Sequence, residues 1–521
     1  MAATFVKNAV DKGAELIVVD PRRQKLVEYA SVFAQINVGS DIAFLNGLMN
    51  VLIEEDLYDK QFVANFCENF DELKNTVIKY PPERAAEICG ISAEMIRIIA
   101  HKLAAVRPSM LCYTLGITEH TCGVNNVMSI ANLQMMLGNV GADCGGVNPL
   151  RGQNNVQGAC DMGALPNVFP GYQSVTNPEV RDKFEKAWNV TGLDDKLGLM
   201  MPHMFEGMAE GKIRFFWCFG EDPAKTEPDI GKVRKELSSM EFMVSQEIFL
   251  TETAKFAHVI LPSAAWSEAD GTYTNSERRV NRVRKVSEAP GEAKPNWWIF
   301  KEVARRLGYN WNSNSPQEIW DNEISNLAPS FAGIKYARIE GDGLQWPCTD
   351  ENHCGTCVLH QGGKFTRGKG LFKGIGWTPP AEVPDKKYPF VLSTGRRLFQ
   401  YNSANQSSRA GMDILFPEET VDISPIDAEK LGITQGEWVK VSSRRGSVTV
   451  IARITKEVPG GMVWMSFHHQ EGNSNWLTNA AFDPVSLTAE YKACAVRVDK
   501  IDQDAPPVGK KVIEAVSQRE K

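Results

Sequence analysis

Short apolar stretches alternate with helical segments over residues 14–152, and this alternation constrains the fold more than any other feature of the chain. The stretch ELIVVDP predicts a strand that ends in a polar turn at Asp20 and Pro21. Helices are predicted from about residue 42 to 54 and from 124 to 137, because apolar residues recur there with helical spacing. Such alternation is typical of a doubly wound parallel sheet, so we predict an α/β domain.

A second α/β segment follows, with predicted strands at residues 213–219, 242–246 and 257–261. Each strand runs into a polar turn, namely GEDP, QEIFLTETA and LPSAAW. Ligands of open α/β sheets bind beyond the carboxyl ends of the strands. We therefore expect a ligand to lie at these turns.

The second half of the chain changes character twice. Residues 309–385 contain Trp-, Pro- and Gly-rich pieces with little periodicity, which indicates a linker wrapped over the surface. The stretches FVLSTG, WVKVSS and SVTVIARI then predict strands, with a short helix in IDAEKLG, so a small β-barrel is expected. The predicted domains are residues 1–153 (α/β), 154–308 (α/β), 309–385 (linker) and 386–521 (barrel).

The composition of the chain excludes several partners. With 23% charged and 43% hydrophobic residues, the 521-residue chain is an ordinary globular protein of several domains. A net charge of −7 argues against nucleic acid or an anionic membrane as the main partner. No apolar run approaches the ~18 residues of a membrane span. The eleven cysteines are scattered, which favours a reducing compartment and therefore the cytoplasm.

The segment RGQNNVQGACDMG, residues 151–163, combines an arginine with two glutamines, two asparagines and three glycines. This composition is unfavourable for a helix or a buried strand, and it predicts a loop. The loop is either an ordinary solvated one or one whose backbone and side-chain amides approach a polar ligand closely.

Three further turns carry groups suited to a nucleotide. VVDPRR places Asp20 and two guanidinium groups at a strand end, suited to a ribose and a pyrophosphate. VGSD ends in Asp41 at a helix start, where the carboxylate either caps the helix or accepts two N–H groups of a guanine. STGRRLFQYNS adds Gly395 for close approach and Arg396 as a phosphate fork. Each turn alone is also explained as a solvated charged turn, but together they predict one large, phosphate-bearing cofactor held by several domains.

Other nucleotide and metal motifs are missing. Neither GxxxxGK[ST] nor GxGxxG occurs, so a standard ATPase or nicotinamide dehydrogenase is not supported. The CxxC of HCGTC, residues 353–357, has no second CxxC and no histidine pair nearby, so we expect a loop there rather than a metal site. The pair His468-His469 is expected to be structural or adjacent to a substrate. No metal ligand is predicted in this chain.

The chain closely resembles the catalytic (alpha) subunit of formate dehydrogenases in the molybdopterin oxidoreductase family. The likeness covers essentially the whole chain and is carried by GITEHTCGVNNV, GNVGADCGGVNPLRGQNNVQGACDMG, ILPSAAWSEADGTYTNSERR, STGRR and EYKACAVRV, in this order. It implies two molybdopterin guanine dinucleotides that hold molybdenum or tungsten, a double-psi-like barrel as the cap domain, and interconversion of formate with carbon dioxide. It also implies that Arg151 holds the formate carboxylate.

The resemblance implies cofactor contacts in each predicted domain. The first domain would bind one guanosine and its neighbouring pterin through Asp20, Pro21, Arg22, Arg23, Gly39, Ser40, Asp41, Leu115 and Glu119. The second domain would bind the other guanosine through Gly220, Glu221, Asp222, Gln246, Glu247 and Asn296. The cap domain would contact the pterins through Thr394, Gly395, Arg396, Arg397, Leu398, Tyr401, Phe467, Asn475 and Lys492.

The sequence departs from the family at its beginning. Family members start with a cysteine-ligated [4Fe–4S] domain, followed by a selenocysteine or cysteine that ligates the metal and then a histidine. The segment MAATFVKNAVDKG at residues 1–13 is predicted to be a helix, and neither these features nor a strand precede it. We expect a truncated reading of a longer protein, for example through a selenocysteine codon taken as a stop; a gene product complete without the segment is the alternative. The chain alone is expected to be inactive, with the [4Fe–4S] cluster confined to the missing region.

Two other functions remain open at this point. One is another molybdopterin oxidoreductase such as a nitrate reductase, and the other is a non-catalytic scaffold subunit of the same fold. The presence of DPRR, GSD, GED and TGRR favours cofactor binding over a scaffold. The partners implied are formate or carbon dioxide and iron–sulfur electron-transfer subunits, with a diaphorase, a hydrogenase or a ferredoxin as alternatives.

Overall fold

The computed structural model describes residues 2–501, and the chain divides into two compact units. The first unit consists of Met1–Asn148, Pro223–Arg234 and His360–Lys521, and the second of Pro149–Asp222 and Lys235–Leu359. Residue 1 and residues 502–521, which belong to the predicted first and last domains, lie outside the described residues. The predicted domain boundaries stay predictions.

A helix buried on all sides lies at the centre of the first unit's helical core. In α2 (Asp41–Glu54), every residue from 42 to 52 is buried, as expected for a helix that is apolar around its circumference. The helices α5 (Pro82–Cys89), α6 (Ala93–Ala105) and α8 (Gly123–Met136) pack against it. The helices predicted at residues 42–54 and 124–137 are confirmed as α2 and α8. The other helices that lie or begin in this unit are α1 (Ala2–Asp11), α3 (Lys60–Phe66), α4 (Phe70–Val77), α7 (Leu115–Thr118), α12 (Pro223–Thr226), α13 (Ile230–Leu237) and α17 (Pro425–Leu431).

The strands outside the barrel of the first unit pair two by two. Parallel pairing joins β1 (Ile17–Val19) to β2 (Val32–Ala34), with Ile17 opposite Val32. Two further pairs are β4 (Met110–Tyr113) with β5 (Gly146–Pro149), and β3 (Cys67–Glu68) with β14 (Gly370–Leu371). The strand predicted in ELIVVDP is confirmed as β1, so the Asp20 turn follows the carboxyl end of a parallel strand. These strands span only two to four residues and form separate sheets instead of one doubly wound sheet.

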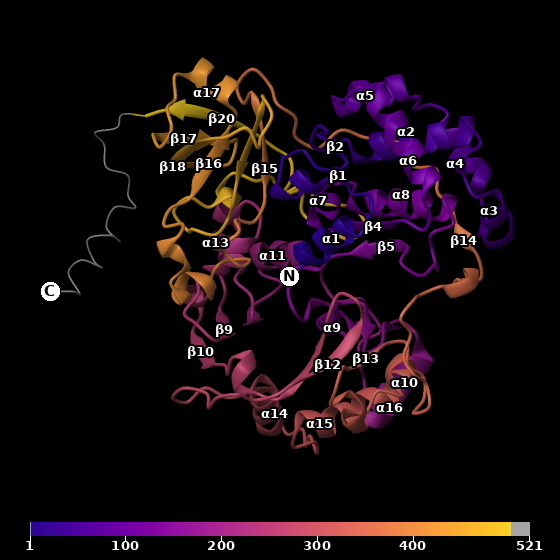
Figure 1. Ribbon diagram of the computed structural model, residues 1–521. Helices are drawn as coiled ribbons and strands as arrows, with labels where there is room; N and C mark the ends of the chain where they lie inside the picture. The colour runs from indigo at the N-terminus through magenta and orange to yellow at the C-terminus, as the bar shows by residue number, and fades with distance from the viewer. Residues whose placement is uncertain (1, 502–521) are drawn as a thin grey trace. The chain divides into compact units, whose positions relative to one another are not determined.

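A closed six-stranded barrel forms the C-terminal part of the first unit (Figure 1). Its strands follow the order β15 (Phe390–Thr394), β19 (Met462–Met465), β16 (Thr420–Ile423), β18 (Ser447–Ile454), β17 (Trp438–Ser442) and β20 (Cys494–Lys500). The alternation in SVTVIARI buries Val448, Val450 and Ala452 in the barrel core. The predicted combination of α/β structure with a C-terminal barrel is therefore confirmed.

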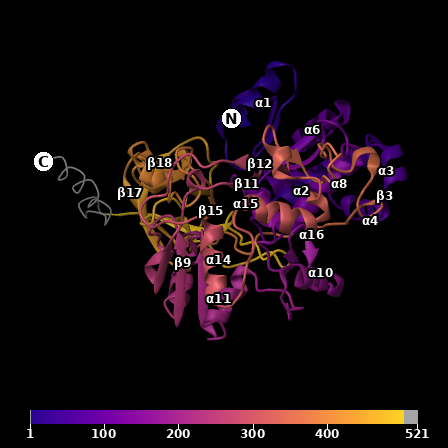
Figure 2. The ribbon, with the colours of Figure 1, turned by 90° about the horizontal axis from the view of Figure 1, so that it is seen from below.

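A three-stranded parallel sheet lies in the second unit. Its strands are ordered β10 (Val259–Pro262), β9 (Phe242–Glu247) and β8 (Phe215–Phe219), which confirms the three strands predicted there. Phe300 of α14 (Asn296–Arg306) packs against Trp217 and Phe219 of β8, with ring centroids 5.3 and 5.2 Å apart. The strands of this sheet run side by side at the label β9 in Figure 2. The carboxyl ends of the strands bring the segments after residues 219, 247 and 262 to one edge of the sheet.

The predicted linker contains a packed core in its first part. Trp320, Phe331, Ile334 and Ile339 are buried together against Val280 of β12. Residues 316–348 are therefore packed rather than wrapped over the surface, although no regular periodicity announces this core in the sequence. The remaining elements of the second unit are β11 (Gly271–Thr274), β12 (Arg279–Val283), β13 (Leu344–Gln345), β6 (Val168–Phe169), β7 (Gln173–Ser174), α9 (Val156–Asp161), α10 (Pro178–Trp188), α11 (Met201–Ala209), α15 (Pro316–Glu318), the π-helix Ile319–Ile324 and α16 (Ser325–Leu327).

Among the helices of residues 2–501, none has the length and hydropathy that a membrane crossing requires.

Candidate functional site

The turn after β1 holds its charged side chains in different ways. Asp20 Oδ1 accepts the backbone N–H of Arg22 at 2.8 Å, and Asp20 Oδ2 accepts Nε2 of Gln24 at 2.9 Å. Burial raises the pKa of Asp20, against the effect of the hydrogen bond from Arg22. Arg23 is exposed, and its guanidinium lies 5.5 Å from the ring of Phe33 without an ion pair to any of residues 2–501.

The turn before α2 presents a buried carboxylate that accepts no hydrogen bond from another described side chain. Gly39 has a φ of +76°, and a Cβ there would lie 2.5 Å from Cγ of Pro380, so the turn requires glycine. Ser40 is the N-cap of α2 and Asp41 is its first helical residue, so the alternative that Asp41 caps the helix is wrong. Burial raises the pKa of Asp41, whose carboxylate accepts no hydrogen bond from the side chain of another described residue.

Predicted residues from several segments meet in the first unit. Nζ of Lys492 lies 2.6 Å from Oε2 of Glu119 and donates to the backbone carbonyl of Thr394 at 3.1 Å. Asp20 is close enough to Asp41 and Lys492 for both charges to act on its carboxyl group. The structure thus brings together residues of DPRR, GSD, LGITE, STGRR and EYK.

Two buried residues beside this group were missed by sequence reasoning. Nδ1 of His120 lies 3.7 Å from Oε1 of Glu490 and has no hydrogen-bond partner within the described part of the chain. His120 is also close enough to Asp41 to lower the pKa of that carboxyl group when the imidazole carries a proton. Glu490 is fully buried and accepts the backbone N–H of Ala381 at 3.0 Å. Their signal in the sequence is their position in GITEH and EYK, next to motif residues that were singled out.

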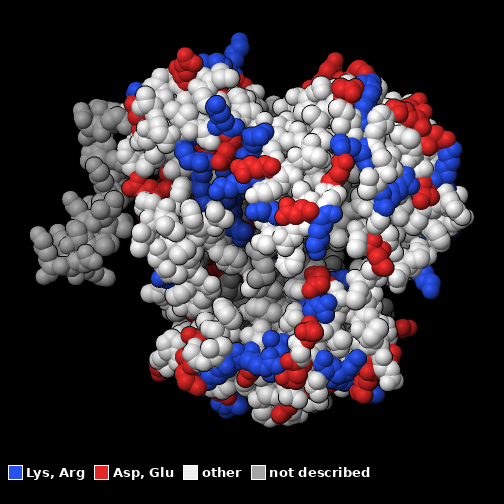
Figure 3. Space-filling model, in the orientation of Figure 1, with Lys and Arg blue, Asp and Glu red and all other residues white. Residues whose placement is uncertain are grey.

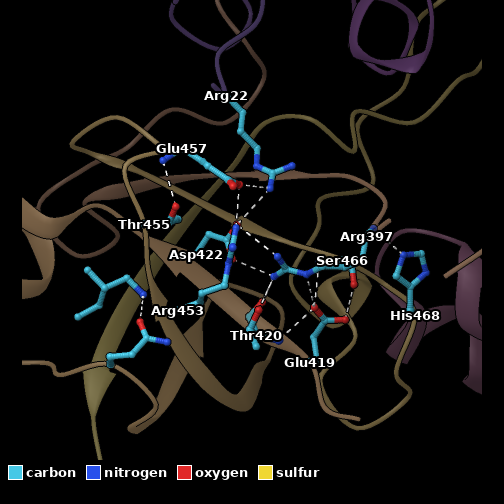
Figure 4. Close-up of polar contacts among 12 residues, drawn as sticks. Arg22, Arg397, Glu419, Thr420, Asp422, Arg453, Thr455, Glu457, Ser466 and His468 are labelled. Atoms are coloured by element: carbon cyan, nitrogen blue, oxygen red, sulfur yellow. Dashed lines mark hydrogen bonds and ion pairs between the residues drawn. The ribbon is translucent and has the colours of Figure 1, made fainter. Parts of the chain in front are cut away.

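The two arginines of TGRR have different surroundings. Arg397 is buried and donates to both carboxylate oxygens of Asp422, at 3.0 and 3.3 Å (Figure 4). Arg396 is exposed, and its guanidinium lies 5.8 Å from the ring of Tyr401. Leu398 is 80% exposed. Exposed apolar and cationic side chains therefore follow β15 at the rim of the barrel.

The segment after β19 is fixed by its own polar contacts. Nδ2 of Asn475 donates to the carbonyl of Thr226 at 2.8 Å, and Phe467 is partly buried beside His468. Nε2 of His468 accepts the backbone N–H of Arg397 at 3.0 Å, and Nδ1 donates to a backbone carbonyl. Burial lowers the pKa of His468 to about 3, so this histidine is neutral and structural.

The ring of Trp464 leaves no space for a side chain at Gly395. A Cβ on Gly395 would lie 2.7 Å from Cζ2 of Trp464. Trp464 is buried, and the guanidinium groups of Arg22 and Arg397 lie 4.2 and 4.5 Å from the centre of its ring. We expect Gly395→Ala to lower the free energy of unfolding of the first unit by about 1–3 kcal/mol, because the ring has no space to move aside. Urea unfolding measures the effect, with Gly116→Ala as control, since nothing lies within 4 Å of a Cβ at Gly116. Equal stability of the two variants would contradict this account.

The strand ends of the second unit carry buried polar groups without partners. Nε2 of Gln246 donates to Oδ1 of Asn296 at 3.0 Å, whereas Oε1 of Gln246 has no partner among the described residues. The hydroxyl of Ser263, a residue that sequence reasoning missed, is likewise buried without a partner in that part of the chain. Asp222 accepts the backbone N–H and the hydroxyl of Thr253 at 2.8 and 2.7 Å. Buried groups of this kind fit a polar ligand at the carboxyl end of a parallel sheet.

The remaining predicted residues of this edge adjoin the same groups. Gly220 adopts a φ of +65°, and its backbone N–H donates to the carbonyl of Gln246 at 3.0 Å. Glu221 is exposed, and Oε1 of Glu247 accepts the backbone N–H of Ile248 at 2.7 Å. The second unit thus brings all six predicted residues of GED, QE and Asn296 to one edge.

The glycine-rich segment after residue 150 is only partly a loop. Residues 151–155 are irregular as predicted, but α9 begins at Val156, so the loop prediction is wrong for residues 156–161. The helix is supported by the contact of Gln157 Nε2 with Asp161 Oδ1 at 2.7 Å, four residues apart. Asp161, missed by sequence reasoning, is fully buried and also accepts the hydroxyl of Tyr172 at 2.8 Å and Nε1 of Trp346 at 2.7 Å.

Arg151 stands exposed at the start of this segment. Its backbone N–H donates to the hydroxyl of Ser276 at 3.2 Å, and its Nη1 lies 3.6 Å from Sγ of Cys160. A thiol is a weak acceptor, so this contact is given up easily to an anion. The arrangement leaves a planar guanidinium fork for a small carboxylate.

The cysteine motif and the surface charges form no site of their own within residues 2–501. Cys354 and Cys357 are exposed free thiols, and no group of three His, Cys, Asp or Glu residues suited to a metal occurs in that range. Basic and acidic side chains are interspersed on the face shown in Figure 3.

Comparison with known proteins identifies the class. Residues 1–306 match the molybdopterin oxidoreductase family, and residues 390–495 match its molybdopterin dinucleotide binding domain. Acetylene hydratase from Pelobacter acetylenicus has the same fold, with a TM-score of 0.74 at 21% identity over 96% of this chain and 75% of the hydratase. The chain therefore belongs to the molybdopterin oxidoreductase family and is part of an oxidoreductase with a metal-carrying molybdopterin cofactor.

Within this family, the chain is similar to formate dehydrogenase alpha subunits. It is 44% identical to the F420-dependent formate dehydrogenase subunit alpha of Methanocaldococcus jannaschii, over 96% of this chain and 74% of that protein. It is 39% identical to formate dehydrogenase H of Escherichia coli, over 97% of this chain and 72% of that protein. The resemblance inferred from the sequence is thus confirmed.

Proposed function

We propose that the chain is the catalytic part of a formate dehydrogenase and interconverts formate with carbon dioxide. The observation that carries the proposal is the 43–45% identity with three F420-dependent formate dehydrogenase alpha subunits over 96% of this chain. An exposed arginine at the head of RGQNNVQGACDMG supports formate as the substrate, because formate offers little besides its carboxylate to hold.

The cofactor in this proposal is molybdenum or tungsten held by two molybdopterin guanine dinucleotides. One guanosine would be bound in the first unit by the Asp20 turn and Asp41, and the other in the second unit by Gln246 and Asn296. The residues fit these roles, because the Asp41 carboxylate can accept guanine N–H groups and Oε1 of Gln246 lacks a partner among the described residues. Bound there, the cofactor supplies the acceptor for the two electrons that formate loses.

Arg151 would bind and orient formate. Two parallel N–H groups of the guanidinium can donate to the two carboxylate oxygens, in the bidentate geometry that arginine favours. This grip directs the C–H bond of formate away from the arginine.

The partners in this proposal are electron-transfer subunits. The relatives are named as alpha subunits, and three of them are F420-dependent, which supports assembly of this chain with at least one other subunit. We propose an iron–sulfur subunit as the first electron acceptor, with a diaphorase, a hydrogenase, a ferredoxin or F420 beyond it, and the cytoplasm as the location.

The proposal is tested on the complex purified from its native organism. Molybdenum and tungsten, guanosine monophosphate released by acid, and formate-dependent reduction of a viologen dye are measured on the same sample. We expect two guanosine monophosphates for each metal ion, together with formate-dependent activity. A complex with neither metal nor nucleotide would contradict the cofactor proposal, and a fully loaded complex without formate activity would contradict the substrate.

Asp41→Asn should lower cofactor retention while leaving the fold intact. The amide keeps the shape of the side chain but replaces one acceptor by a donor, which would face the guanine N–H groups. Because Ser40 and not Asp41 occupies the N-cap position of α2, thermal unfolding of the apo-protein should change little. The measurement is guanosine monophosphate released per chain, beside the melting temperature of the apo-protein. Loss of both to the same extent would show a structural role for Asp41.

A further inference from the structure

Two of the Arg-Arg pairs in the first unit, Arg22-Arg23 and Arg396-Arg397, divide in the same way. Arg22 and Arg397 both face the buried carboxylate of Asp422, whereas Arg23 and Arg396 stay exposed. Neither exposed guanidinium has an ion pair with any residue of the range 2–501; each lies near an aromatic ring instead. Adjacent arginines of one motif therefore have different electrostatic surroundings.

Arg22 and Arg397 belong to a network that we call the barrel network, defined as Arg22, Arg397, Arg453, Asp422 and Glu457 (Figure 4). Its centre is Asp422, whose side chain is 0% exposed. Nε and Nη2 of Arg453 donate to the two Asp422 oxygens at 2.9 and 2.8 Å, and Arg397 donates to the same oxygens. Nη2 of Arg453 also donates to Oε2 of Glu457 at 2.8 Å.

Arg22 joins the turn after β1 to this network. Its guanidinium pairs with Glu457, lies 3.6 Å from Oδ2 of Asp422, and stacks 4.2 Å from the ring of Trp464. The backbone N–H of the next residue, Arg23, donates to the carbonyl of Glu457 at 2.7 Å. Side-chain and backbone contacts thus both fix the DPRR turn to the segment between β18 and β19.

The charges of the barrel network disfavour a phosphate at Arg22. A phosphate bound there would lie beside the carboxylates of Asp422 and Glu457, and like charges at such distances repel. Arg23, one residue further on, has no ion pair with a carboxylate of residues 2–501, so a phosphate can bind there without this repulsion.

We propose that Arg22 and Glu457 are positioning residues that fix the DPRR turn to the barrel, and that Arg23 binds the diphosphate of the guanine dinucleotide. The inference rests on the proposed function, because it assumes that a guanosine lies at this turn. It assigns different roles to two adjacent arginines of one motif.

Guanosine and guanosine diphosphate are the probes that separate the two roles. Both are titrated against the full apo-chain and its Arg22→Ala, Arg23→Ala and Glu457→Gln variants. Arg23→Ala should weaken guanosine diphosphate binding about tenfold or more, since a charge-assisted hydrogen bond is lost, and should leave guanosine binding unchanged. Arg22→Ala and Glu457→Gln should weaken both probes by one common factor, because they release the turn that carries Asp20. They should also lower the melting temperature of the apo-chain by about 2 °C or more, which Arg23→Ala should not.

Arg22→Lys is the conservative variant for the positioning role. It keeps a cation for Glu457 and should restore most of the melting temperature and of the guanosine affinity that Arg22→Ala loses. An Arg22→Ala variant that loses affinity for guanosine diphosphate alone, with an unchanged melting temperature, would overturn the inference.

Binding of the two probes to the wild-type chain distinguishes a failure of this inference from a failure of the proposed function. A wild type that binds neither probe would contradict the cofactor site itself and, with it, the role of Arg23. In that case the double variant Arg22→Ala/Glu457→Gln still tests whether Arg22 and Glu457 act together. A loss of melting temperature that differs from the sum of the losses in the two single variants supports the positioning role. A loss equal to that sum overturns it.

Discussion

Arg151→Ala is expected to lower kcat/KM for formate by two orders of magnitude or more in the assembled, metal-loaded enzyme. Losing one charge-assisted hydrogen bond costs about 1.5–3 kcal/mol, and each ~1.36 kcal/mol is one decade in rate. A bidentate grip loses two such bonds and the charge together. Arg151 lies in an exposed loop, and its guanidinium contacts only the weakly accepting thiol of Cys160 among the described residues, so the fold should not suffer.

Two further variants separate the guanidinium fork from its charge. Arg151→Lys keeps the charge but loses the fork, so its kcat/KM should fall between those of wild type and Arg151→Ala. Arg305→Ala removes an exposed arginine that pairs with Glu302 in the same unit, and it should leave kcat/KM unchanged. Metal and guanine nucleotide are measured in each sample to exclude loss of cofactor. A fully loaded Arg151→Ala enzyme within about threefold of wild type would refute the assignment.

Local patterns were sufficient to predict several of the helices and strands. The helices at residues 42–54 and 124–137 and the barrel strand SVTVIARI were predicted because apolar periodicity is a property of a short window. Strand pairing was not predictable in the same way, because register and neighbours are set by distant residues. Residues 14–152 accordingly have the expected elements, but their strands form separate pairs. The helix α9 was missed because the glycine-rich composition around Gln157 and Asp161 outweighed their helical spacing.

The candidate site was predictable as a set of motifs, whereas the roles within each motif were not. Asp41 could be singled out from VGSD, but only the structure shows that Ser40 occupies the N-cap position of the helix. The difference between Arg22 and Arg23 depends on Glu457, which lies 435 residues away from Arg22 in the chain. Ser263 and His120 carry polar groups whose lack of a partner among the described residues becomes visible only after folding.

Asp422→Asn is expected to lower the free energy of unfolding of the barrel by about 3 kcal/mol or more. Removing one partner of a buried ion pair leaves the other charge uncompensated, which typically costs about 3–5 kcal/mol. Asp422 is the shared partner of Arg397 and Arg453, and the amide can neither neutralise them nor accept on both atoms. Hydrogen exchange of the amides in β16 and β19 measures this local stability.

The control for this variant is a surface ion pair of the same barrel. Asp499→Asn breaks the ion pair between Oδ2 of Asp499 and Nε of Arg497, which lie 2.8 Å apart. Both side chains are more than one third exposed. Such a pair contributes about 0–1 kcal/mol, so the two variants should differ clearly. If the two variants lose unfolding free energies within about 1 kcal/mol of each other, the barrel network adds no more stability than a surface pair.

The pH dependence of the same difference tests whether the charge of Asp422 is responsible. Burial alone would raise the pKa of Asp422, but the hydrogen bonds from Arg453 and the charge of Arg397 outweigh it and lower the pKa below the ordinary value of 3.8. A carboxyl group whose pKa is lowered by folding stabilises the folded state above its unfolded pKa, and this contribution is lost as the pH falls through the folded pKa. The stability difference between wild type and Asp422→Asn should therefore stay constant from about pH 5 to 8 and shrink only below about pH 3.9. A difference that already disappears between pH 5 and 6 would show that a group other than Asp422 carries the effect.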